Sequence, residues 1–215
     1  MTTLINENEL VPFLVECKAL KFGSFITKSG RTSPYFVNMG TICSGEGVSF
    51  LAGCYAKVFQ ERFAKKADNL FGPAYKGIPL CTATAAALHK EYGTNVSFTY
   101  NRKEAKDHGE GGILVGDTYQ EKKRIVIIED VITAGTSIAE TMKIMEAIPN
   151  AKVVGLIVAM DRKEKLSDGK SALQQVKEKY NIEAYSIASI EDILKFAPEE
   201  YKESIEKYRK EWGVH

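Results

Sequence analysis

Two short runs of apolar residues limit what this chain can fold into. Residues 125–128 and 153–158 carry an apolar side chain or glycine at every position. A strand that faces water on one side alternates between apolar and polar residues, whereas a strand covered on both faces does not. We therefore expect both runs to be strands inside a sheet that has helices on both of its faces.

Short apolar runs of this kind alternate with helical patterns along most of the chain. Such alternation is typical of βα units that build a parallel sheet. Open sheets of this class bind ligands at the carboxyl ends of their strands, so the candidate site is expected at that edge. The expected strands are residues 69–71, 96–100, 125–128, 153–160 and 184–189, and the expected helices are residues 45–65, 79–92, 137–148 and 171–180.

Both ends of the chain add smaller elements. A helix is predicted at residues 10–20, followed by two extended segments at 23–27 and 33–38, and these form a small N-terminal lobe. Residues 198–212 are charged and helical in character, which is typical of a solvated surface helix. Neither an internal repeat nor a linker divides the chain, so a single domain is expected over residues 1–215.

The composition argues against several classes of function. The chain has 29 Lys and Arg against 28 Asp and Glu, a net charge of +1, so no general basic field favours nucleic acid binding. No apolar run reaches membrane-spanning length, and the N-terminus lacks the features of a signal peptide. The cysteines of this chain form no CxxC pair and have no His at metal-ligand spacing, which favours free thiols in a reducing cytoplasm. The four are Cys17, Cys43, Cys54 and Cys81.

The segment after the apolar run at 125–128 combines features of an anion site with two acids. Glu129 and Asp130 come first, and residues 133–137, Thr-Ala-Gly-Thr-Ser, follow. Backbone N–H groups in such a turn can converge on one anion. Residues 137–140 have a capping-box pattern, so the turn is expected to lead into a helix N-terminus, which attracts phosphate. Taken without the acids, the segment fits a plain βα turn as well as a phosphate loop.

The two carboxylates narrow the choice of ligand. They would repel a phosphate unless they bind hydroxyl groups or a metal ion, and the vicinal diol of a ribose supplies two hydroxyl donors. A sugar phosphate is therefore the ligand that fits both parts of the segment. A nucleotide-binding P-loop is disfavoured. Its motif needs a glycine five positions before the second glycine of Gly-Lys-Ser, and the Gly-Lys-Ser at residues 169–171 has Glu164 there.

Residues 124–137, RIVIIEDVITAGTS, resemble the phosphoribosyl pyrophosphate (PRPP) signature of the type I phosphoribosyltransferases. In that family the acids hold the ribose hydroxyls and the loop holds the 5′-phosphate. The resemblance implies an α/β fold with a central, mostly parallel sheet flanked by helices and a small N-terminal hood. The first acid is Glu129, where orotate enzymes of the family commonly have Asp. The PRPP-binding residues implied are Glu129, Asp130, Val131, Ile132, Thr133, Ala134, Gly135, Thr136 and Ser137.

Two further segments are similar to parts of the orotate phosphoribosyltransferases. Residues 71–80, FGPAYKGIPL, taken alone predict a tight turn with an exposed lysine, and residues 101–112, NRKEAKDHGEGG, a mobile charged loop. Beside a phosphoribosyl site, a glycine-rich turn with a lysine suits a pyrophosphate, and a cationic lid would exclude water. The first segment resembles the pyrophosphate loop of that family and the second its catalytic lid. The resemblance implies PRPP contacts from Tyr75, Lys76, Arg102, Lys103, Lys106 and His108, with Lys106, Lys103 and Asp130 as catalytic residues.

The base site is predicted from the N-terminal lobe and from one strand end. Residues 28–38, KSGRTSPYFVN, are similar to the hood of orotate phosphoribosyltransferases, which implies that Lys28 meets the diphosphate and that Phe36 and Val37 border orotate. Family members often have a second Phe where this chain has Val37. Arg162 follows a predicted strand, and from the residues alone it fits a surface salt bridge as well as a partner for a planar carboxylate. The resemblance implies that Arg162 and Thr133 bind orotate.

Taken together, the resemblance implies an orotate phosphoribosyltransferase. Such an enzyme transfers the ribose 5-phosphate of PRPP to N1 of orotate, with inversion at C1′, and gives orotidine 5′-monophosphate and diphosphate on the route to UMP. Mg²⁺ is expected to travel mainly with the diphosphate, so no dedicated protein metal site is expected. A homodimer with lid residues reaching the partner's site is implied, with a hood at roughly 1–40 plus C-terminal elements and a core at roughly 41–190.

Two alternatives remain open at this point. A phosphoribosyltransferase for a purine or uracil would share the Thr-Ala-Gly-Thr-Ser loop, but it would need neither the lid sequence nor a carboxylate-binding Arg162. A regulatory protein that binds PRPP without turnover would usually carry a nucleic-acid-binding surface, and the net charge of +1 argues against one.

Overall fold

The computed structural model describes residues 9–27, 30–106, 112–133 and 135–214. Its centre is a six-stranded sheet with the order β5-β4-β3-β6-β7-β8. All neighbouring strands are parallel except β4 and β5, which are antiparallel. The strands are β3 (Asn69–Gly72), β4 (Ser97–Lys106), β5 (Gly112–Gly116), β6 (Lys123–Ile132), β7 (Ala151–Asp161) and β8 (Glu183–Ser189).

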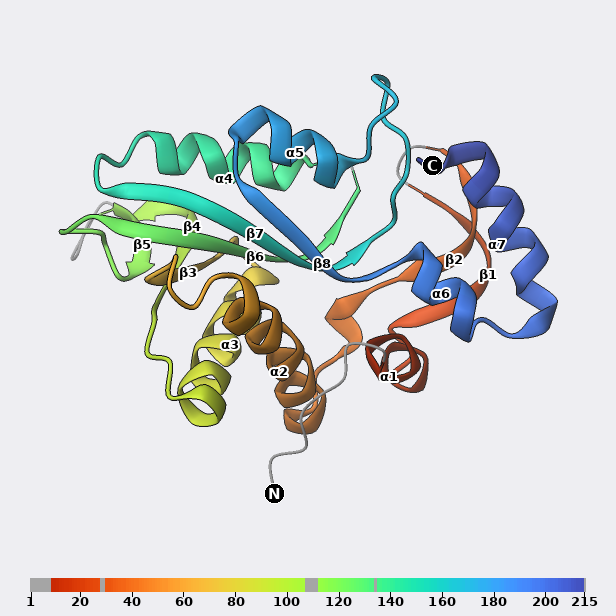
Figure 1. Cartoon of the computed structure of the whole chain (residues 1–215), viewed down its shortest axis with the longest axis horizontal. Coiled ribbons are helices and arrows are strands. Elements are labelled where there is room, and N and C mark those ends of the chain that lie inside the picture. Colours follow the sequence, from red (N-terminus) through yellow and green to blue (C-terminus); the bar gives the residue numbers. More distant parts are fainter. Residues whose placement is uncertain (1–8, 28–29, 107–111, 134, 215) are drawn as a thin grey trace.

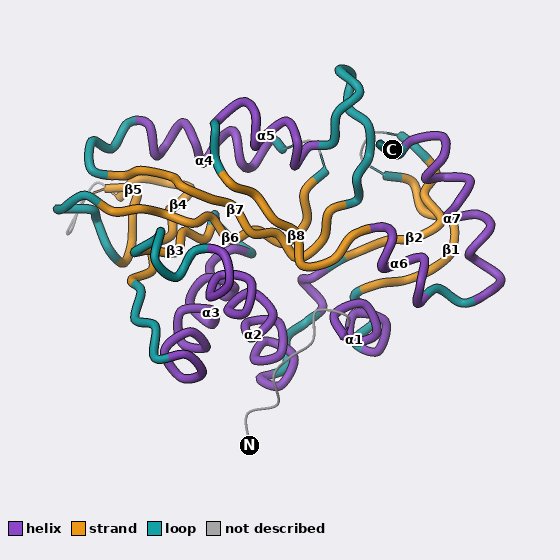
Figure 2. The backbone as a smooth tube through the Cα atoms, viewed as in Figure 1, coloured by secondary structure: helices purple, strands orange, loops and turns teal. Residues whose placement is uncertain are grey.

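Helices cover the sheet in two layers (Figures 1 and 2). Helices α2 (Gly45–Arg62) and α3 (Gly77–Tyr92) lie on one face, and α4 (Thr136–Glu146) and α5 (Ala172–Tyr180) lie on the other. The side chains of β6 and β7 divide between these layers, as the uninterrupted apolar runs require. Val126 and Ile157 belong to the apolar cluster that includes α2, whereas Ile127 and Leu156 belong to the cluster that includes α4 and α5. The α/β class predicted from the sequence is confirmed.

A smaller unit lies beside the carboxyl end of the sheet. Strands β1 (Leu20–Ile26) and β2 (Thr32–Val37) form an antiparallel two-stranded sheet, and α1 (Leu10–Glu16) packs on β1. The chain returns to this unit after β8 with α6 (Ile190–Phe196) and α7 (Glu199–Trp212). We call these five elements the hood. A short 3₁₀ turn, η2 (Met39–Thr41), links β2 to α2.

Several details differ from the sequence-based expectations. Helix α7 is not a fully solvated helix, because Ile205 and Tyr208, spaced to share one face, are buried against the hood. The segment expected to be a charged loop begins as strand, since β4 continues to Lys106. Strand β5 and helix α6 were not predicted from the sequence. Among the described residues, no helix combines the length and the apolar character needed to cross a membrane.

One glycine in β7 is required by packing. A Cβ built on Gly155 would collide with the ring of Phe63, which follows α2 and is buried. Because the ring is enclosed by the core, it cannot move aside without cost.

We expect Gly155→Ala to lower the free energy of unfolding by about 1–3 kcal/mol, the usual cost of overpacking a core, as measured by urea denaturation. Gly45→Ala is the matched control, because a Cβ on Gly45, the first residue of α2, would meet open space. Equal midpoints for Gly155→Ala and Gly45→Ala would contradict this account of the packing.

Candidate functional site

A polar cleft of about 720 Å³ opens at the carboxyl ends of β3 and β6, the edge where the sequence predicts a ligand. Four parts of the chain form it: the loop between β3 and α3, the strand β4, the start of β5, and the end of β6 with helix α4. The residues that line it are Pro73, Ala74, Tyr75, Lys76, Asn101, Arg102, Lys103, Ile113, Glu129, Asp130, Val131, Ser137, Glu140, Thr141 and Ile144.

The two acids of the signature are buried at the end of β6. Glu129 and Asp130 are 7% and 8% exposed. The N–H of Asp130 donates to Glu129 Oε1 at 3.0 Å, and the N–H of Val131 donates to Asp130 Oδ1 at 2.8 Å. Burial, and to a lesser extent the charge of Asp130, raises the pKa of Glu129 to about 7. The strand end therefore offers carboxylate oxygens as hydrogen-bond acceptors, and the Glu129 carboxyl can bind a proton close to neutral pH.

Beneath the acids, the hydroxyl of Tyr55 in α2 donates to the backbone carbonyl of Glu129 at 2.6 Å. Tyr55 is fully buried, and desolvation together with the nearby Asp130 and Glu129 raises its pKa well above its usual value. The tyrosine therefore stays a hydroxyl donor and fixes the backbone that carries the acids.

Lys76 places a positive charge opposite these acids. Its Nζ lies 2.8 Å from Asp130 Oδ2, although the lysine side chain itself is about half exposed at 55%. The loop that carries Lys76 is compact, because a Cβ on Gly72 would collide with the carbonyl of Gly77. The Ala74–Tyr75 peptide is cis, and the N–H of Ala74 donates to Asn101 Oδ1 at 2.9 Å. The β3–α3 loop is thus tied to β4.

Strand β4 brings further cations to the same cleft. Arg102 and Lys103 line it from a strand that β3 separates from β6, and Lys103 Nζ lies 4.9 Å from the ring centroid of the exposed Tyr75. A cation at this distance is attracted to the electron-rich face of the ring. The cleft therefore combines cationic and acidic side chains around one space.

The turn into α4 is built differently from the predicted capping box. The helix begins at Thr136, and Gly135 is its N-cap residue with a φ of 71°. No side chain among the described residues caps this helix, so Ser137 does not act as the predicted N-cap. Glycine enters the left-handed conformation without steric cost, which lets the helix start earlier than the sequence pattern indicated. The first N–H groups of α4 are left for a ligand such as phosphate.

The residues predicted to bind the base lie toward the hood. None of them is among the described residues that line the polar cleft. Phe36 is exposed and stacks on Phe25 with centroids 5.6 Å apart, and Val37 is half-buried. Arg162 is only 5% exposed. It is therefore not the surface salt bridge that the sequence left open, because its ion pair, with Glu164 at 2.6 Å, is buried.

The register of the sheet relates Arg162 to the signature. Ile132 pairs with Asp161 in the parallel ladder, so Thr133 and Arg162 leave adjacent strands at the same level. The sequence-predicted residues thus fall into two neighbouring groups, one in the cleft and one between core and hood. Lys28, His108 and Ala134 lie outside the described residues, and only the backbone of Lys106, at the end of β4, is described.

Sequence reasoning missed several residues of the cleft. Glu140 and Thr141 lie three and four positions after Ser137, so they share its side of α4. Helical spacing from the loop could therefore have identified them. Asn101 begins the lid motif, but its bond to the β3–α3 loop has no signal in the sequence.

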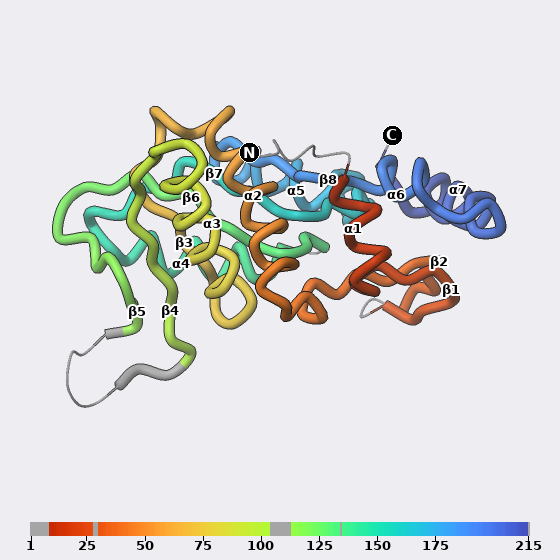
Figure 3. The backbone as a smooth tube through the Cα atoms, turned by 90° about the horizontal axis from the view of Figure 1, so that it is seen from below, coloured from red at the N-terminus to blue at the C-terminus, as the bar shows by residue number. Residues whose placement is uncertain are grey.

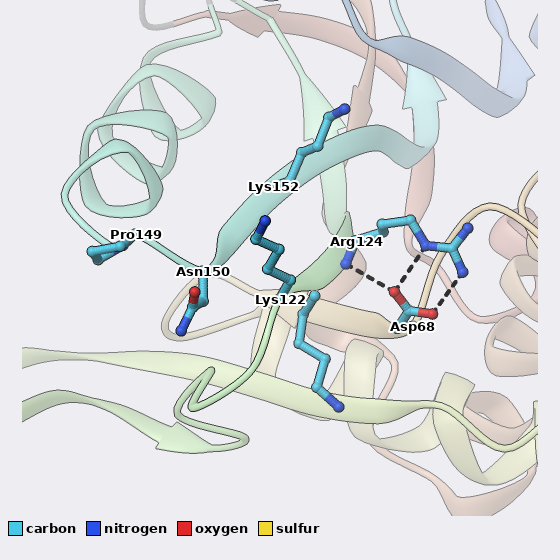
Figure 4. Close-up of a pocket in the computed structure, with 7 residues that line it drawn as sticks. Asp68, Lys122, Arg124, Pro149, Asn150 and Lys152 are labelled. Carbon is cyan, nitrogen blue, oxygen red and sulfur yellow. Dashed lines mark hydrogen bonds and ion pairs between the residues drawn. The ribbon is translucent and has the colours of Figure 1, made fainter.

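A second concavity, of about 510 Å³, lies at the opposite end of the sheet, where β6 and β7 begin (Figure 4). Arg124 there is held by Asp68 through Nε at 2.9 Å and Nη2 at 2.7 Å, which lowers the pKa of Asp68. Lys123 pairs with Asp117 at 3.3 Å. Two of the four cations that line this concavity are thus paired with acids of the fold. The cleft at the carboxyl ends is the better candidate site, because it gathers the residues of three sequence motifs.

The described side chains do not by themselves surround a metal ion. Among them, no group of three or more His, Cys, Asp or Glu is placed to hold a metal ion. Glu129 and Asp130 could supply two carboxylate oxygens to an ion that brings its other ligands with it.

Comparison with known proteins agrees with this arrangement. Residues 49–189 match the phosphoribosyl transferase domain family. Orotate phosphoribosyltransferases of Clostridium acetobutylicum and Aliivibrio fischeri are 42% and 44% identical over 219 and 213 residues, each covering 97% of this chain and 98% of the relative. The crystal structure of orotate phosphoribosyltransferase from Francisella tularensis has a TM-score of 0.83 and 35% identity, covering 94% of this chain and 98% of that chain. The resemblance seen in the motifs is confirmed, and the chain belongs to the orotate phosphoribosyltransferases within the phosphoribosyl transferase domain family.

Proposed function

We propose that this chain transfers the ribose 5-phosphate of PRPP to N1 of orotate and releases diphosphate, giving orotidine 5′-monophosphate for UMP synthesis. The observation that carries the proposal is the cleft that the buried acids Glu129 and Asp130 line together with Lys76, Arg102 and Lys103. A ribose that carries phosphate at one end and diphosphate at the other needs hydroxyl acceptors between two anion sites.

Each wall of the cleft has a part in this reaction. Glu129 and Asp130 accept the ribose hydroxyls, and residues 131–137 receive the 5′-phosphate on the N-terminus of α4. Tyr75, Lys76, Arg102 and Lys103 face the diphosphate. As the bond to C1′ breaks, negative charge grows on the leaving diphosphate, and these cations stabilise it. Lys103, Lys106 and Asp130 are the proposed catalytic residues, and Lys28 and His108 complete the diphosphate contacts.

Mg²⁺ fits the same space as a companion of the substrate. Bound to the diphosphate, it would neutralise charge on the leaving group, and Glu129 and Asp130 are the cleft residues that would hold it. An ion that keeps its water and phosphate ligands needs only one or two carboxylates from the protein. The chain's own residues hold the ribose and orient the diphosphate.

Orotate is placed between the cleft and the hood. Phe36 offers an exposed aromatic face, with Val37 beside it, and Thr133 and Arg162 lie at adjacent strand ends. A guanidinium is the natural partner of the orotate carboxylate. This pairing favours orotate over a purine or over uracil, which have no carboxylate.

The assembly and location are proposed on separate grounds. The β4–β5 ribbon extends away from the rest of the sheet (Figure 3), which supports a homodimer in which it serves the partner's site. The four cysteines are free thiols, which supports a reducing, cytoplasmic location. One apolar cluster includes Leu10 and Leu14 of the hood and Leu70 and Val126 of the core, which supports a single domain over residues 1–215.

The reaction is tested by mixing the protein with Mg²⁺, PRPP and orotate and following the ultraviolet absorbance of orotate. We expect turnover that depends on all three. Orotate should be the preferred base, because Arg162 pairs with its carboxylate. Adenine, hypoxanthine and uracil serve as competing bases. Turnover of one of these bases but not of orotate would refute the assignment to orotate, and PRPP binding without turnover of any base would favour the regulatory alternative.

Lys76→Met is expected to lower kcat/KM for PRPP by at least about tenfold, the scale of a charge-assisted contact to a phosphate group, measured by initial rates. Lys152→Met is the control, because Lys152 lines the concavity at the far end of the sheet. Equal rates for the two variants would remove Lys76 from the diphosphate site.

Glu129 gives the ligand-free protein a pH dependence with a defined sign. Its folded pKa of about 7 exceeds its ordinary value of 4.5, so its stabilising contribution is complete below pH 4.5 and is lost as the pH rises through 7. Relative to Glu129→Gln, wild-type unfolding free energy should fall by on the order of 2 kcal/mol between pH 5 and 8, as measured by urea denaturation. Glu140→Gln, on an exposed side chain of the same cleft, should show no such trend. A difference between wild type and Glu129→Gln that does not change with pH would contradict the role of burial.

A further inference from the structure

Glu164 joins three parts of the chain that are far apart in sequence. Its Oε1 accepts the Nε–H of Arg162 at 2.6 Å and the hydroxyl of Tyr208 in α7 at 2.8 Å. Its Oε2 lies 3.5 Å from Nη1 of Arg31, in the turn between β1 and β2. The Glu164 and Arg162 side chains are 10% and 6% exposed, so these bonds form largely out of water.

Together with the bond to Glu164, three further contacts hold the Arg162 guanidinium. Nη2 donates to Ser33 Oγ at 3.0 Å and to the Tyr208 hydroxyl at 3.5 Å. The guanidinium carbon stands 4.4 Å from the ring centroid of Tyr35. Within the described residues, Nη1 of Arg162 takes no part in these hydrogen bonds. The group is thus fixed in plane and direction, with one nitrogen left for a ligand.

The C-terminal segment secures the loop that carries Glu164. Glu164 forms a β-bridge with Gly213, and the N–H of Lys165 donates to the carbonyl of Trp212 at 2.6 Å. The Arg31 guanidinium in turn lies 4.4 Å from the Trp212 ring centroid. Helix α7 and the residues after it therefore set the position of a side chain at the end of β7.

We propose that Glu164, supported by Tyr208, is a positioning residue that holds Arg162 in place for the orotate carboxylate. The proposal rests on the function proposed above. Two arginines share one glutamate, so the cluster of Arg31, Arg162 and Glu164 keeps an excess of positive charge, which an anionic base complements. A buried ion pair contributes little net stability, because desolvation offsets its Coulomb energy. Orientation of the guanidinium is what the pair supplies.

The test compares Michaelis constants for the two substrates. Glu164→Gln keeps the shape of the side chain but removes its charge, and it should raise KM for orotate by about tenfold, the scale of one charged hydrogen bond. KM for PRPP should change less than about twofold, since PRPP binds in the other group of residues. Tyr208→Phe, which leaves the ring in place, should raise KM for orotate by a smaller factor.

Glu183→Gln is the matched control, because Glu183 likewise accepts from one cationic side chain and one tyrosine hydroxyl. These are Lys66 at 2.6 Å and Tyr185 at 2.8 Å, at the far end of the sheet. It should change neither KM. Thermal unfolding of every variant separates a loss of folding from a loss of orientation. The positioning role would be overturned if Glu164→Gln and Tyr208→Phe raised KM for PRPP as much as KM for orotate. It would also be overturned if neither variant raised KM for orotate.

Arg162→Ala distinguishes this outcome from failure of the proposed function. If Arg162→Ala raises KM for orotate while Glu164→Gln and Tyr208→Phe leave it unchanged, Arg162 binds orotate without the help of Glu164, and only the positioning role is overturned. If Arg162→Ala also leaves KM for orotate unchanged, the orotate role of Arg162 is overturned with it. If the wild-type protein does not turn over orotate, both proposals are overturned.

Discussion

Two carboxylates at the end of a buried strand impose the constraint on which the rest of the site depends. Glu129 and Asp130 cannot be removed from water without partners. The backbone N–H groups of Asp130 and Val131 supply two of these partners, and Lys76 supplies a third. To deliver Lys76, the β3–α3 loop must turn tightly, and Gly72 and Gly77 allow that close approach. The loop and the acids therefore form one unit.

A second junction connects this unit to the hood. Arg162 leaves β7 beside Thr133 and bonds to Ser33 of β2, so one side chain spans the boundary between the two sheets. The hood is thus held to the core by contacts close to the ligand-binding edge. The residues proposed for the base come from the N-terminal part of the chain and from its middle, and Tyr208 near the C-terminus supports them through Arg162 and Glu164.

Much of this architecture could be predicted from the sequence, because the core helices carry a helical spacing of apolar residues and most core strands are short apolar runs. Strand β5 of the central sheet was the exception. The acids and the cations of the cleft were found as well, since they cluster in short motifs next to strand ends. The surroundings of Arg162 could not be found in this way. Glu164, Ser33 and Tyr208 meet only through tertiary structure, and Tyr208 lies in a helix whose charged composition conceals its buried face. The start of α4 was also misjudged, because a left-handed glycine replaced the side-chain cap that the pattern indicated.

The ion pair between Lys76 and Asp130 gives this lysine a counter-ion that belongs to the protein. A lysine without a counter-ion would gather mobile anions, and a ligand would displace them on binding. Here Asp130 is that counter-ion, so the diphosphate proposed to bind Lys76 would exchange one partner for another. Because few mobile ions are released in such an exchange, ligand affinity through Lys76 depends less on ionic strength than it would at an unpaired lysine. The acid thereby shields the site from the many small anions that share the solution with the substrate.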